Sequence, residues 1–392
     1  MNPTQERFAR RFLFLACAML ISALPPSGLV LASPGESATA VPPPLRVIYF
    51  VTRDRQPCRD YEMRLDRVMR EVQRFYRDGM KADGFGEKTF ALETDSHGRL
   101  RIHLVSARED SASYGRDASD KVRSEVKARM LEQGMDIDHE TIVIFQTLLS
   151  WEGAKAIEVG PYVGTGDHLS GTAWVYDDDH LDPSLLADKQ PGGYYMRPCS
   201  IGEFNSHYIG GVAHELGHAF GLPHLAETAA QRVKGISLMG GGNHTYGNNL
   251  RGEGRGAFLH PLSALCLANI RAFSGDRPQA GVRPTCKLVE LNAEFNSGEM
   301  IFSGRLQSDI SVLGLGAYDD LESIPSDYDA TGWVAQLQPE GRFRLVVAEL
   351  RKGASQLRLV VAHENGTVTV FPYNYVVDDA GHPGLEAFRL RQ

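Results

Sequence analysis

Between residues 46 and 176, apolar runs alternate with stretches of helical periodicity. Short β-branched and aromatic runs predict three strands, at 46–52, 100–107 and 141–149. Apolar residues spaced three and four apart predict an amphipathic helix at 59–82. A charged stretch predicts a second, mostly solvated helix at 118–133. The alternation of strand and helix is typical of a mixed α/β sheet with helices packed on it.

Further elements of this sheet domain are expected downstream. GTAWVY (171–176) follows a glycine-rich loop and is predicted to be an antiparallel edge strand of the sheet. Ser200 and Glu203 stand in the capping-box relation, so a helix is expected to begin there and to run to about Phe220. A last helix is predicted at about 261–273, before the turn-prone SGDRPQAG, which is the candidate domain boundary.

From Lys287 onward the hydrophobic pattern changes to short alternating runs separated by turn residues at roughly ten-residue spacing. These runs are EMIFSGRL, ISVLGLGAY, WVAQLQ, FRLVVAEL, LRLVVAHE and TVTVFPYNYVV. Such spacing is typical of an antiparallel sandwich. We therefore predict an α/β domain at 46–280 and an all-β sandwich, Ig-like or fibronectin-like, at 287–392.

The first 45 residues are predicted to lie outside the fold. Three arginines precede an apolar run from Phe12 to Leu24, and small residues near Ala32 suit signal peptidase. Residues 1–32 are therefore expected to be a cleaved export signal, with an uncleaved anchor as the alternative, and 33–45 a linker rich in Pro, Ser, Ala and Gly. No later segment is apolar for long enough to span a bilayer, so a secreted or periplasmic protein without a membrane span is expected.

Composition and cysteine content narrow the picture further. The 392 residues suffice for two domains, and a formal net charge of −8 makes nucleic acid an improbable partner. After export, four cysteines remain in a compartment where disulfides persist: Cys58, Cys199, Cys266 and Cys286. Disulfides are expected among them, but three pairings are conceivable and the sequence does not choose. The absence of a C-x-x-C spacing argues against a cysteine zinc site.

The segment GGVAHELGHAFGLPH (210–224) carries the candidate chemistry. His214 and His218 lie four apart, so on a helix both imidazoles project from one face and can grip a single ion. Gly221 suits a sharp helix end that requires a positive φ, and the reversal would return His224 as a third ligand. Three neutral imidazoles leave a position open for water, as in a catalytic Zn²⁺ site, and Glu215 is placed to act as general base.

These residues support a specific reaction, with two alternatives. The set predicts a zinc-dependent endopeptidase that hydrolyses peptide bonds of a protein or peptide substrate. One alternative is a metal-dependent amidase or deacylase acting on a non-peptide substrate. The other is a secreted binding protein with a vestigial zinc site, in which the C-terminal sandwich binds the ligand. The sandwich is otherwise expected to dock substrate or a surface, by analogy alone.

The same segment resembles the metzincin pattern H-E-x-x-H-x-x-G-x-x-H at every defined position. This resemblance implies a zinc metallopeptidase fold with a methionine turn beneath the metal, for which GISLMGG offers Met239, and an edge strand that pairs with the bound peptide. Residues 46–275 are also similar to a poorly characterised group of bacterial and fungal metallopeptidases. Several metzincins carry a tyrosine two residues after that methionine, where this chain has Gly241. Tyr246 is the nearest substitute, and whether it assists catalysis stays open.

Two further groups of residues have competing interpretations. His207 could share the face of His214, but a solvated or outer-shell histidine is favoured. An acidic cluster could bind calcium through its oxygens, although a solvated loop is favoured because no EF-hand spacing accompanies it. Its members are Asp177, Asp178, Asp179 and Asp182.

Overall fold

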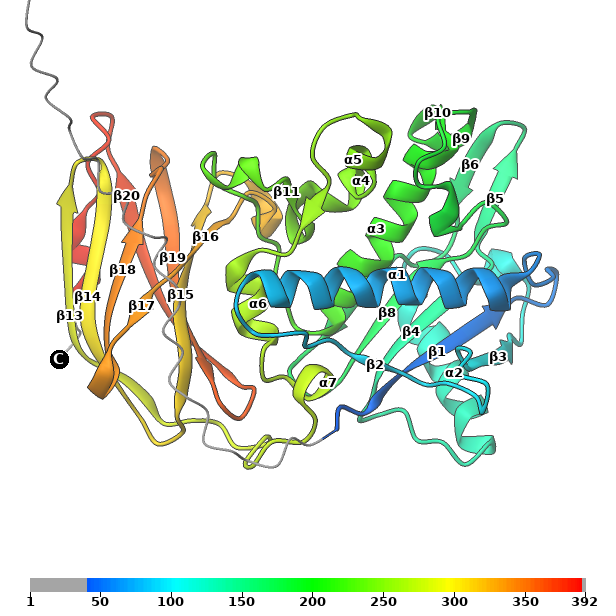
Figure 1. Ribbon diagram of the computed structural model, residues 1–392, viewed down its shortest axis with the longest axis horizontal. Coiled ribbons are helices and arrows are strands. Elements are labelled where there is room, and N and C mark those ends of the chain that lie inside the picture. Colours follow the sequence, from blue (N-terminus) through cyan, green and yellow to red (C-terminus); the bar gives the residue numbers. More distant parts are fainter. Residues whose placement is uncertain (1–40, 390–392) are drawn as a thin grey trace, which may run out of the picture.

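The computed structural model describes residues 41–389. A six-stranded mixed sheet is the centre of residues 41–280, called the first half below (Figure 1). Its strands are β1 (Pro44–Val51), β2 (Ala91–Leu92), β3 (Ile102–Ser106), β4 (Thr141–Gln146), β7 (Val163–Gly166) and β8 (Gly171–Tyr176). β4 pairs in parallel with one edge of β1, and β2 and β3 share its other edge. β8 adds in parallel to β4, and β7 ends the sheet as an antiparallel strand. The predicted α/β sheet is thus confirmed.

Helices cover both faces of this sheet. They are α1 (Tyr61–Ala82), α2 (Ser119–Glu132), α3 (Ile201–Ala219), and the shorter α4 (Asn243–Thr245), α5 (Asn248–Arg251), α6 (Pro261–Leu267) and α7 (Arg271–Ser274). Tyr49 of β1 stacks on Tyr61 of α1, whereas its neighbour Phe50 contacts Tyr114, just before α2. Because successive side chains of a strand point to opposite faces, α1 and α2 lie on opposite sides of the sheet. α3 packs on the side of α1, where the Tyr76 hydroxyl donates to the Ala213 carbonyl.

Short two-stranded units complete the first half: β5 (Leu149–Glu152) with β6 (Lys155–Glu158), β9 (Pro191–Tyr195) with β10 (Arg197–Ser200), and β11 (Ile236–Ser237) with β12 (Ala257–Phe258). None of the helices between residues 41 and 389 combines the length and apolar character that a membrane span requires.

Three details of the first half differ from the sequence predictions. GTAWVY is β8, which is flanked by β4 and β7, so the edge strand is β7 instead. The expected linker ends earlier than predicted, since β1 begins at Pro44. The helix predicted at 261–273 is two short helices, α6 and α7. The predicted export signal and most of the linker lie outside the described residues.

Residues 286–389, the second or C-terminal half, contain two antiparallel four-stranded sheets that form the sandwich. One has the order β13 (Cys286–Asn296), β14 (Glu299–Ser308), β18 (Arg342–Val347), β17 (Gln336–Leu337), and the other β16 (Thr331–Val334), β15 (Val312–Leu321), β19 (Gly353–His363), β20 (Val368–Val377). A separate core fills the space between them, with Phe302 and Leu345 from one sheet and Leu315 and Leu359 from the other. The C-terminal all-β region agrees with the sequence pattern.

The two halves are packed against each other through the outer face of β15 and β16. Gly314 and Gly316 of β15 leave no side chain between the strand and Leu265 and Leu262 of α6, since a Cβ atom there would lie about 2.5 Å from the leucine methyl groups. Backbone pairing adds to this contact, because the Ala226 N–H donates to the Ala330 carbonyl at 2.7 Å. The sheet that contains β15 and β16 therefore packs directly on the first half (Figure 1).

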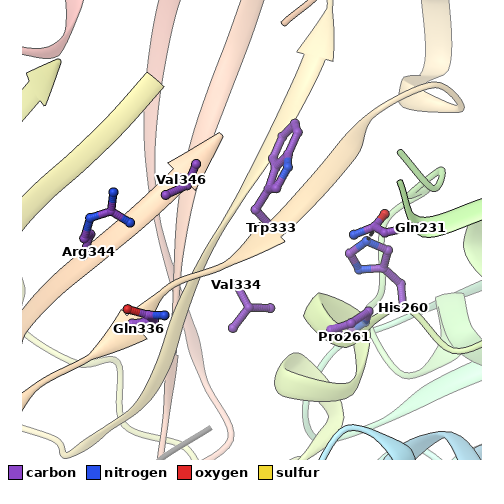
Figure 2. A pocket seen from close by; sticks show the side chains of 8 residues that line it. All are labelled: Gln231, His260, Pro261, Trp333, Val334, Gln336, Arg344 and Val346. Atoms are coloured by element: carbon purple, nitrogen blue, oxygen red, sulfur yellow. Dashed lines mark hydrogen bonds between the residues drawn. The ribbon is translucent and has the colours of Figure 1, made fainter. Parts of the chain in front are cut away.

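A pocket of about 300 Å³ lies at the same junction (Figure 2). Gln231 and His260 from the first half face Trp333 and Arg344 from the second. The polar groups of Gln231 already have partners, because its amide nitrogen donates to the Gly332 carbonyl and its oxygen contacts His260. The hydrogen bond from Gln231 to Gly332 joins the two halves.

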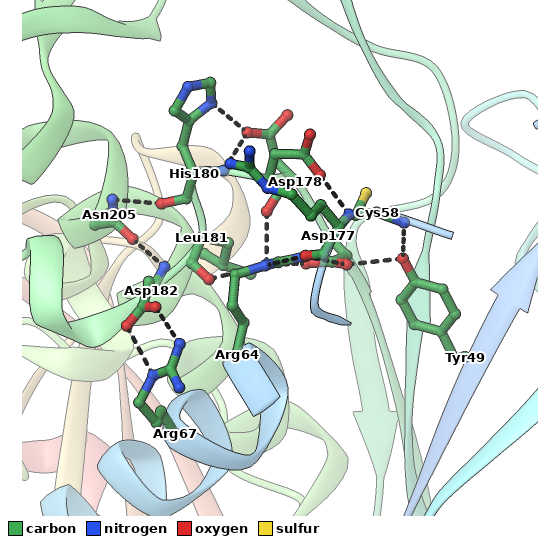
Figure 3. A network of polar contacts seen from close by, with 12 residues as sticks. Tyr49, Cys58, Arg64, Arg67, Asp177, Asp178, His180, Leu181, Asp182 and Asn205 are labelled. Carbon is green, nitrogen blue, oxygen red and sulfur yellow. Dashed lines mark hydrogen bonds and ion pairs between the residues drawn. The ribbon is translucent and has the colours of Figure 1, made fainter. Parts of the chain in front are cut away.

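The acidic cluster after β8 is a buried ion-pair network, not a solvated loop (Figure 3). Arg64 of α1 donates to both carboxylate oxygens of Asp177 at 2.8 and 3.0 Å, and the Tyr49 hydroxyl donates to the same carboxylate. Asp178 binds His180 and Trp151. The solvated-loop prediction was wrong because the cationic partner is more than 100 residues away in the chain. Asp179 alone is exposed.

Replacing Arg64 tests the importance of this network for stability. Arg64 is 5% and Asp177 1% exposed, so Arg64→Ala leaves a buried carboxylate without its cation. We expect a loss of about 3 to 5 kcal/mol in the free energy of unfolding, measured with urea at pH 7. Because burial raises the pKa of Asp177, the deficit should shrink as the pH falls and the carboxyl takes up a proton.

Arg53→Ala is the control, since it removes an ion pair to Asp110 that is exposed to solvent and should change stability little. Equal effects of the two substitutions would contradict a structural role for the buried pair.

Candidate metal centre

α3 carries His214, Glu215 and His218, and it begins where the sequence predicts. The Ser200 hydroxyl accepts a hydrogen bond from the Glu203 N–H at 3.1 Å, which caps the helix. Ile209, Val212 and Leu216 are fully buried and attach the helix to the core. The helix ends at Ala219, and Gly221 follows with a φ of +84°, which reverses the chain direction.

The reversal brings three histidine side chains together. Their ligand atoms all lie within 4.8 Å of one another. His218 Nε2 lies 3.1 Å from both His214 Nε2 and His224 Nε2. The spacing of His214 and His218 on one helix face and the return of His224 after Gly221 thus produce one compact cluster, which could hold a metal ion.

Hydrogen bonds on the opposite side of each ring determine which nitrogen carries the proton. His214 Nδ1 lies 2.8 Å from the Leu238 carbonyl, and His218 Nδ1 lies 2.8 Å from the Leu222 carbonyl. A carbonyl oxygen only accepts, so each Nδ1 is the protonated nitrogen and each Nε2 of a neutral ring presents a lone pair. The inward-facing nitrogens are therefore the ones free to bind a cation.

Burial keeps these rings neutral. It lowers the pKa of His214 to about 3 and lowers that of His218 as well. Lone pairs of neutral nitrogens 3.1 Å apart repel each other unless a cation or a proton lies between them, and burial disfavours the proton. The electrostatics of the cluster thus favour a metal ion.

Glu215 lies beside this cluster and is 8% exposed. Burial raises the pKa of its carboxyl to about 7, against the opposing effects of the His224 ring and the Gly164 N–H. A carboxyl group with such a pKa can both accept and release a proton near neutral pH.

The edge strand β7 lies directly against α3 because β7 has glycines at the contact. A Cβ atom at Gly164 would lie 1.9 Å from the Glu215 carbonyl oxygen, and one at Gly166 would lie 2.1 Å from the Ala219 carbonyl oxygen. Strand β7 can therefore run beside the histidine cluster only with these glycines in place.

Met239, which the metzincin resemblance placed beneath the metal, packs against Gly217 of α3. It is 1% exposed, and its sulfur occupies the space that a side chain at Gly217 would need, 2.3 Å from an ideal Cβ position there. The preceding residue, Leu238, supplies the carbonyl that orients His214.

Tyr246 and His207 face other parts of the molecule. The Tyr246 hydroxyl donates to Glu71 of α1 and its ring packs on Phe75, so the phenol faces α1. His207 is buried, contrary to the solvated interpretation, and stacks on Tyr195 with ring centroids 3.3 Å apart.

The four cysteines of the described chain are unpaired thiols, so the expected disulfides are absent from residues 41–389. They lie in different surroundings, which explains why none pairs. Cys58 precedes α1, Cys199 is in β10, Cys266 is in α6 beside Tyr318, and Cys286 opens β13.

The contacts that His224 makes with the C-terminal half could not be found in the sequence. His224 Nδ1 lies 3.1 Å from both the Ser326 carbonyl oxygen and an Asp327 carboxylate oxygen. The Tyr328 ring stacks on His224 with a centroid distance of 3.6 Å. All three residues belong to the C-terminal half, about a hundred residues away, and no motif marks them.

No protein-family model matches the sequence, and neither does any curated protein. Among solved structures, the chain is similar to OgpA from Akkermansia muciniphila. Catalytically inactive OgpA in complex with an O-glycopeptide substrate, glycodrosocin, is 24% identical with a TM-score of 0.74, over 86% of this chain and 94% of OgpA. Wild-type OgpA gives the same identity and TM-score over 90% and 96%. This likeness shows a shared fold, and its coverage extends over both halves of the chain.

Gly211→Ala tests how tightly α3 is packed at the site. A Cβ atom there would lie 1.7 Å from the Tyr162 hydroxyl, so either that ring or the helix must move. We expect a loss of about 1 to 3 kcal/mol in the free energy of unfolding, measured by chemical denaturation. Gly115→Ala is the control, because nothing lies within 4 Å of the added atom and a change of no more than about 0.5 kcal/mol is expected. Equal stabilities of the two variants would show that the Tyr162 side chain can move aside without a measurable loss of stability.

Proposed function

We propose that the chain is a zinc-dependent endopeptidase of the metzincin type, with His214, His218 and His224 as zinc ligands and Glu215 as general base. The observation that carries the proposal is the convergence of three histidine side chains beside a buried carboxyl group. Zinc–nitrogen bonds of about 2.0 to 2.1 Å at tetrahedral angles separate two ligand nitrogens by about 3.3 Å. The two separations of 3.1 Å, from His218 Nε2 to His214 Nε2 and to His224 Nε2, fit such a donor set.

When bound, a zinc ion supplies Lewis-acid chemistry, since it polarises a carbonyl group and makes water acidic near neutral pH. The remaining work falls to the protein. Glu215 takes the proton of the attacking water on its carboxylate and passes it to the leaving amine.

Strand β7 is the proposed binding site for the peptide backbone. It pairs with β8 along one edge only, and Val163 and Thr165 are exposed. A peptide can add to the free edge of such a strand through backbone hydrogen bonds. This addition would carry the peptide past Glu215, because Gly164 touches that residue.

The proposed substrate class is a protein or peptide, and O-glycosylated peptides are its first candidates. Support comes from the shared fold with OgpA, which has been captured with an O-glycopeptide substrate. We further propose that residues 1–32 direct export, on the strength of the basic and apolar pattern of that segment, and that the sandwich is Ig-like.

The metal and the base are tested together by two variants. Purified protein should contain about one zinc ion per chain by atomic emission, and chelation should abolish cleavage. His218→Ala should lose the zinc. Glu215→Gln should retain zinc but lose about 10²- to 10⁴-fold in kcat/KM, because only the proton acceptor is removed. The exposed His97 provides a matched control, and His97→Ala should retain both zinc and activity. Full activity of Glu215→Gln would overturn the proposed mechanism.

A substrate panel distinguishes the proposed activity from its alternatives. The zinc-loaded protein is incubated with denatured casein, a mixed peptide library, and one peptide prepared with and without an O-linked glycan on a serine or threonine. We expect cleavage products by mass spectrometry that require Glu215. Hydrolysis of acyl-amide substrates without peptide cleavage would favour an amidase instead. An inert protein that keeps its zinc would indicate a vestigial site.

A further inference from the structure

A loop of the C-terminal half reaches the outer side of the histidine cluster. It connects β15 to β16 and presents three consecutive residues to His224. The Ser326 carbonyl and the Asp327 carboxylate accept the Nδ1–H, each at 3.1 Å, and the Tyr328 ring covers one face of the imidazole. Contacts at both the edge and the face of the ring restrict its rotation.

His224 differs from the other two ligands in what orients it. The outer nitrogens of His214 and His218 donate to backbone carbonyls of the first half, at Leu238 and Leu222. For His224, the Nδ1 partners within residues 41–389 come only from the C-terminal half, and one of them is a carboxylate. The first half alone thus leaves its third ring without an outer hydrogen bond.

The carboxylate itself is held from behind. Arg358 of β19 lies 3.6 Å from the second oxygen of Asp327 and also pairs with Asp320 at 3.4 Å. The guanidinium sits over the ring of Tyr318, which limits its movement. Arg358 therefore attracts the oxygen of Asp327 that does not contact His224.

The backbone of the loop adopts a conformation that side chains disfavour. Ser326 has a φ of +72° and Asp327 a φ of +44°, so two successive residues other than glycine lie in the left-handed region. Such conformations persist where surrounding contacts impose them, and they concentrate at functional sites. Here the strained pair is the one that offers both oxygen atoms to His224.

We propose that Asp327 is a positioning residue of the metal centre, which makes the C-terminal half a structural part of that centre. This inference rests on the proposed zinc site. A carboxylate that accepts the Nδ1–H of a histidine ligand orients the ring and raises the basicity of its Nε2. The loop in the C-terminal half thus controls how tightly His224 holds the metal.

The zinc dissociation constant of Asp327→Asn tests this role directly. Competition with a chromophoric chelator at fixed pH should show binding weakened by about 10- to 100-fold. Asp379→Asn is the control, because it removes an exposed carboxylate of the C-terminal half that pairs with Lys352 and has no part in the contacts around His224, and it should bind zinc within about twofold of wild type. Thermal melting of the metal-free proteins confirms that both variants fold.

A double-mutant cycle separates positioning from a general structural effect. In the His224→Ala background, Asp327→Asn should have no further effect on the remaining zinc affinity, because the ring that it orients is gone. Equal losses in both backgrounds, or unchanged zinc affinity of Asp327→Asn in the otherwise wild-type protein, would overturn the inference.

These outcomes are distinct from a failure of the proposed function. If wild-type protein binds zinc but cleaves no peptide, the proposed peptidase activity is wrong. The zinc affinities of the variants still decide the role of Asp327. Wild-type protein that binds no zinc would overturn both.

Discussion

The candidate site depends on the hydrogen bonds that tie the outer nitrogen of each histidine to an oxygen atom. A carbonyl or carboxylate oxygen accepts and never donates, so these bonds place the ring proton on Nδ1 and direct the Nε2 lone pair inward. Burial reinforces the arrangement, because it lowers the pKa of His214 to about 3 and keeps that ring neutral. Three convergent side chains then form a donor set that could hold a cation, and the role proposed for Glu215 depends on that cation.

The close approach of β7 to α3 explains the glycines around this helix. For the free edge of a strand to lie near a carboxyl group on a buried helix, the two backbones must approach closely. Gly164 and Gly166 on β7 and Gly211 on α3 provide that space, since side chains at these positions would overlap Glu215, Ala219 or Tyr162. The absence of side chains at these glycines is therefore what allows the strand that could bind a peptide to lie next to the residues that could cleave it.

Local features of the site were predictable from the sequence, because they depend on residues close together in the chain. The Ser200 cap, the placement of two histidines one helical turn apart and the reversal at Gly221 are all set within one segment. Relations between distant segments were not. GTAWVY has the composition of a strand at either position in a sheet, so only the structure distinguishes the interior strand from the edge. The charges after β8 indicate a solvated loop until Arg64 of α1 is placed beside them. An even number of cysteines permits pairing but does not place any two together.

The contact between Asp327 and His224 extends this reasoning to the domain organisation. Turn signals and strand periodicity divide the chain near residue 280, and a separate hydrophobic core does fill the second half. A division in pattern does not imply independence, however, because Gly314 and Gly316 pack β15 onto α6 and the following loop orients the third ring of the cluster. A shared fold with OgpA over both halves is consistent with this dependence. The sandwich is thus better understood as a wall of the site than as an appended module, and docking of a substrate or surface by its outer sheet remains a separate prediction.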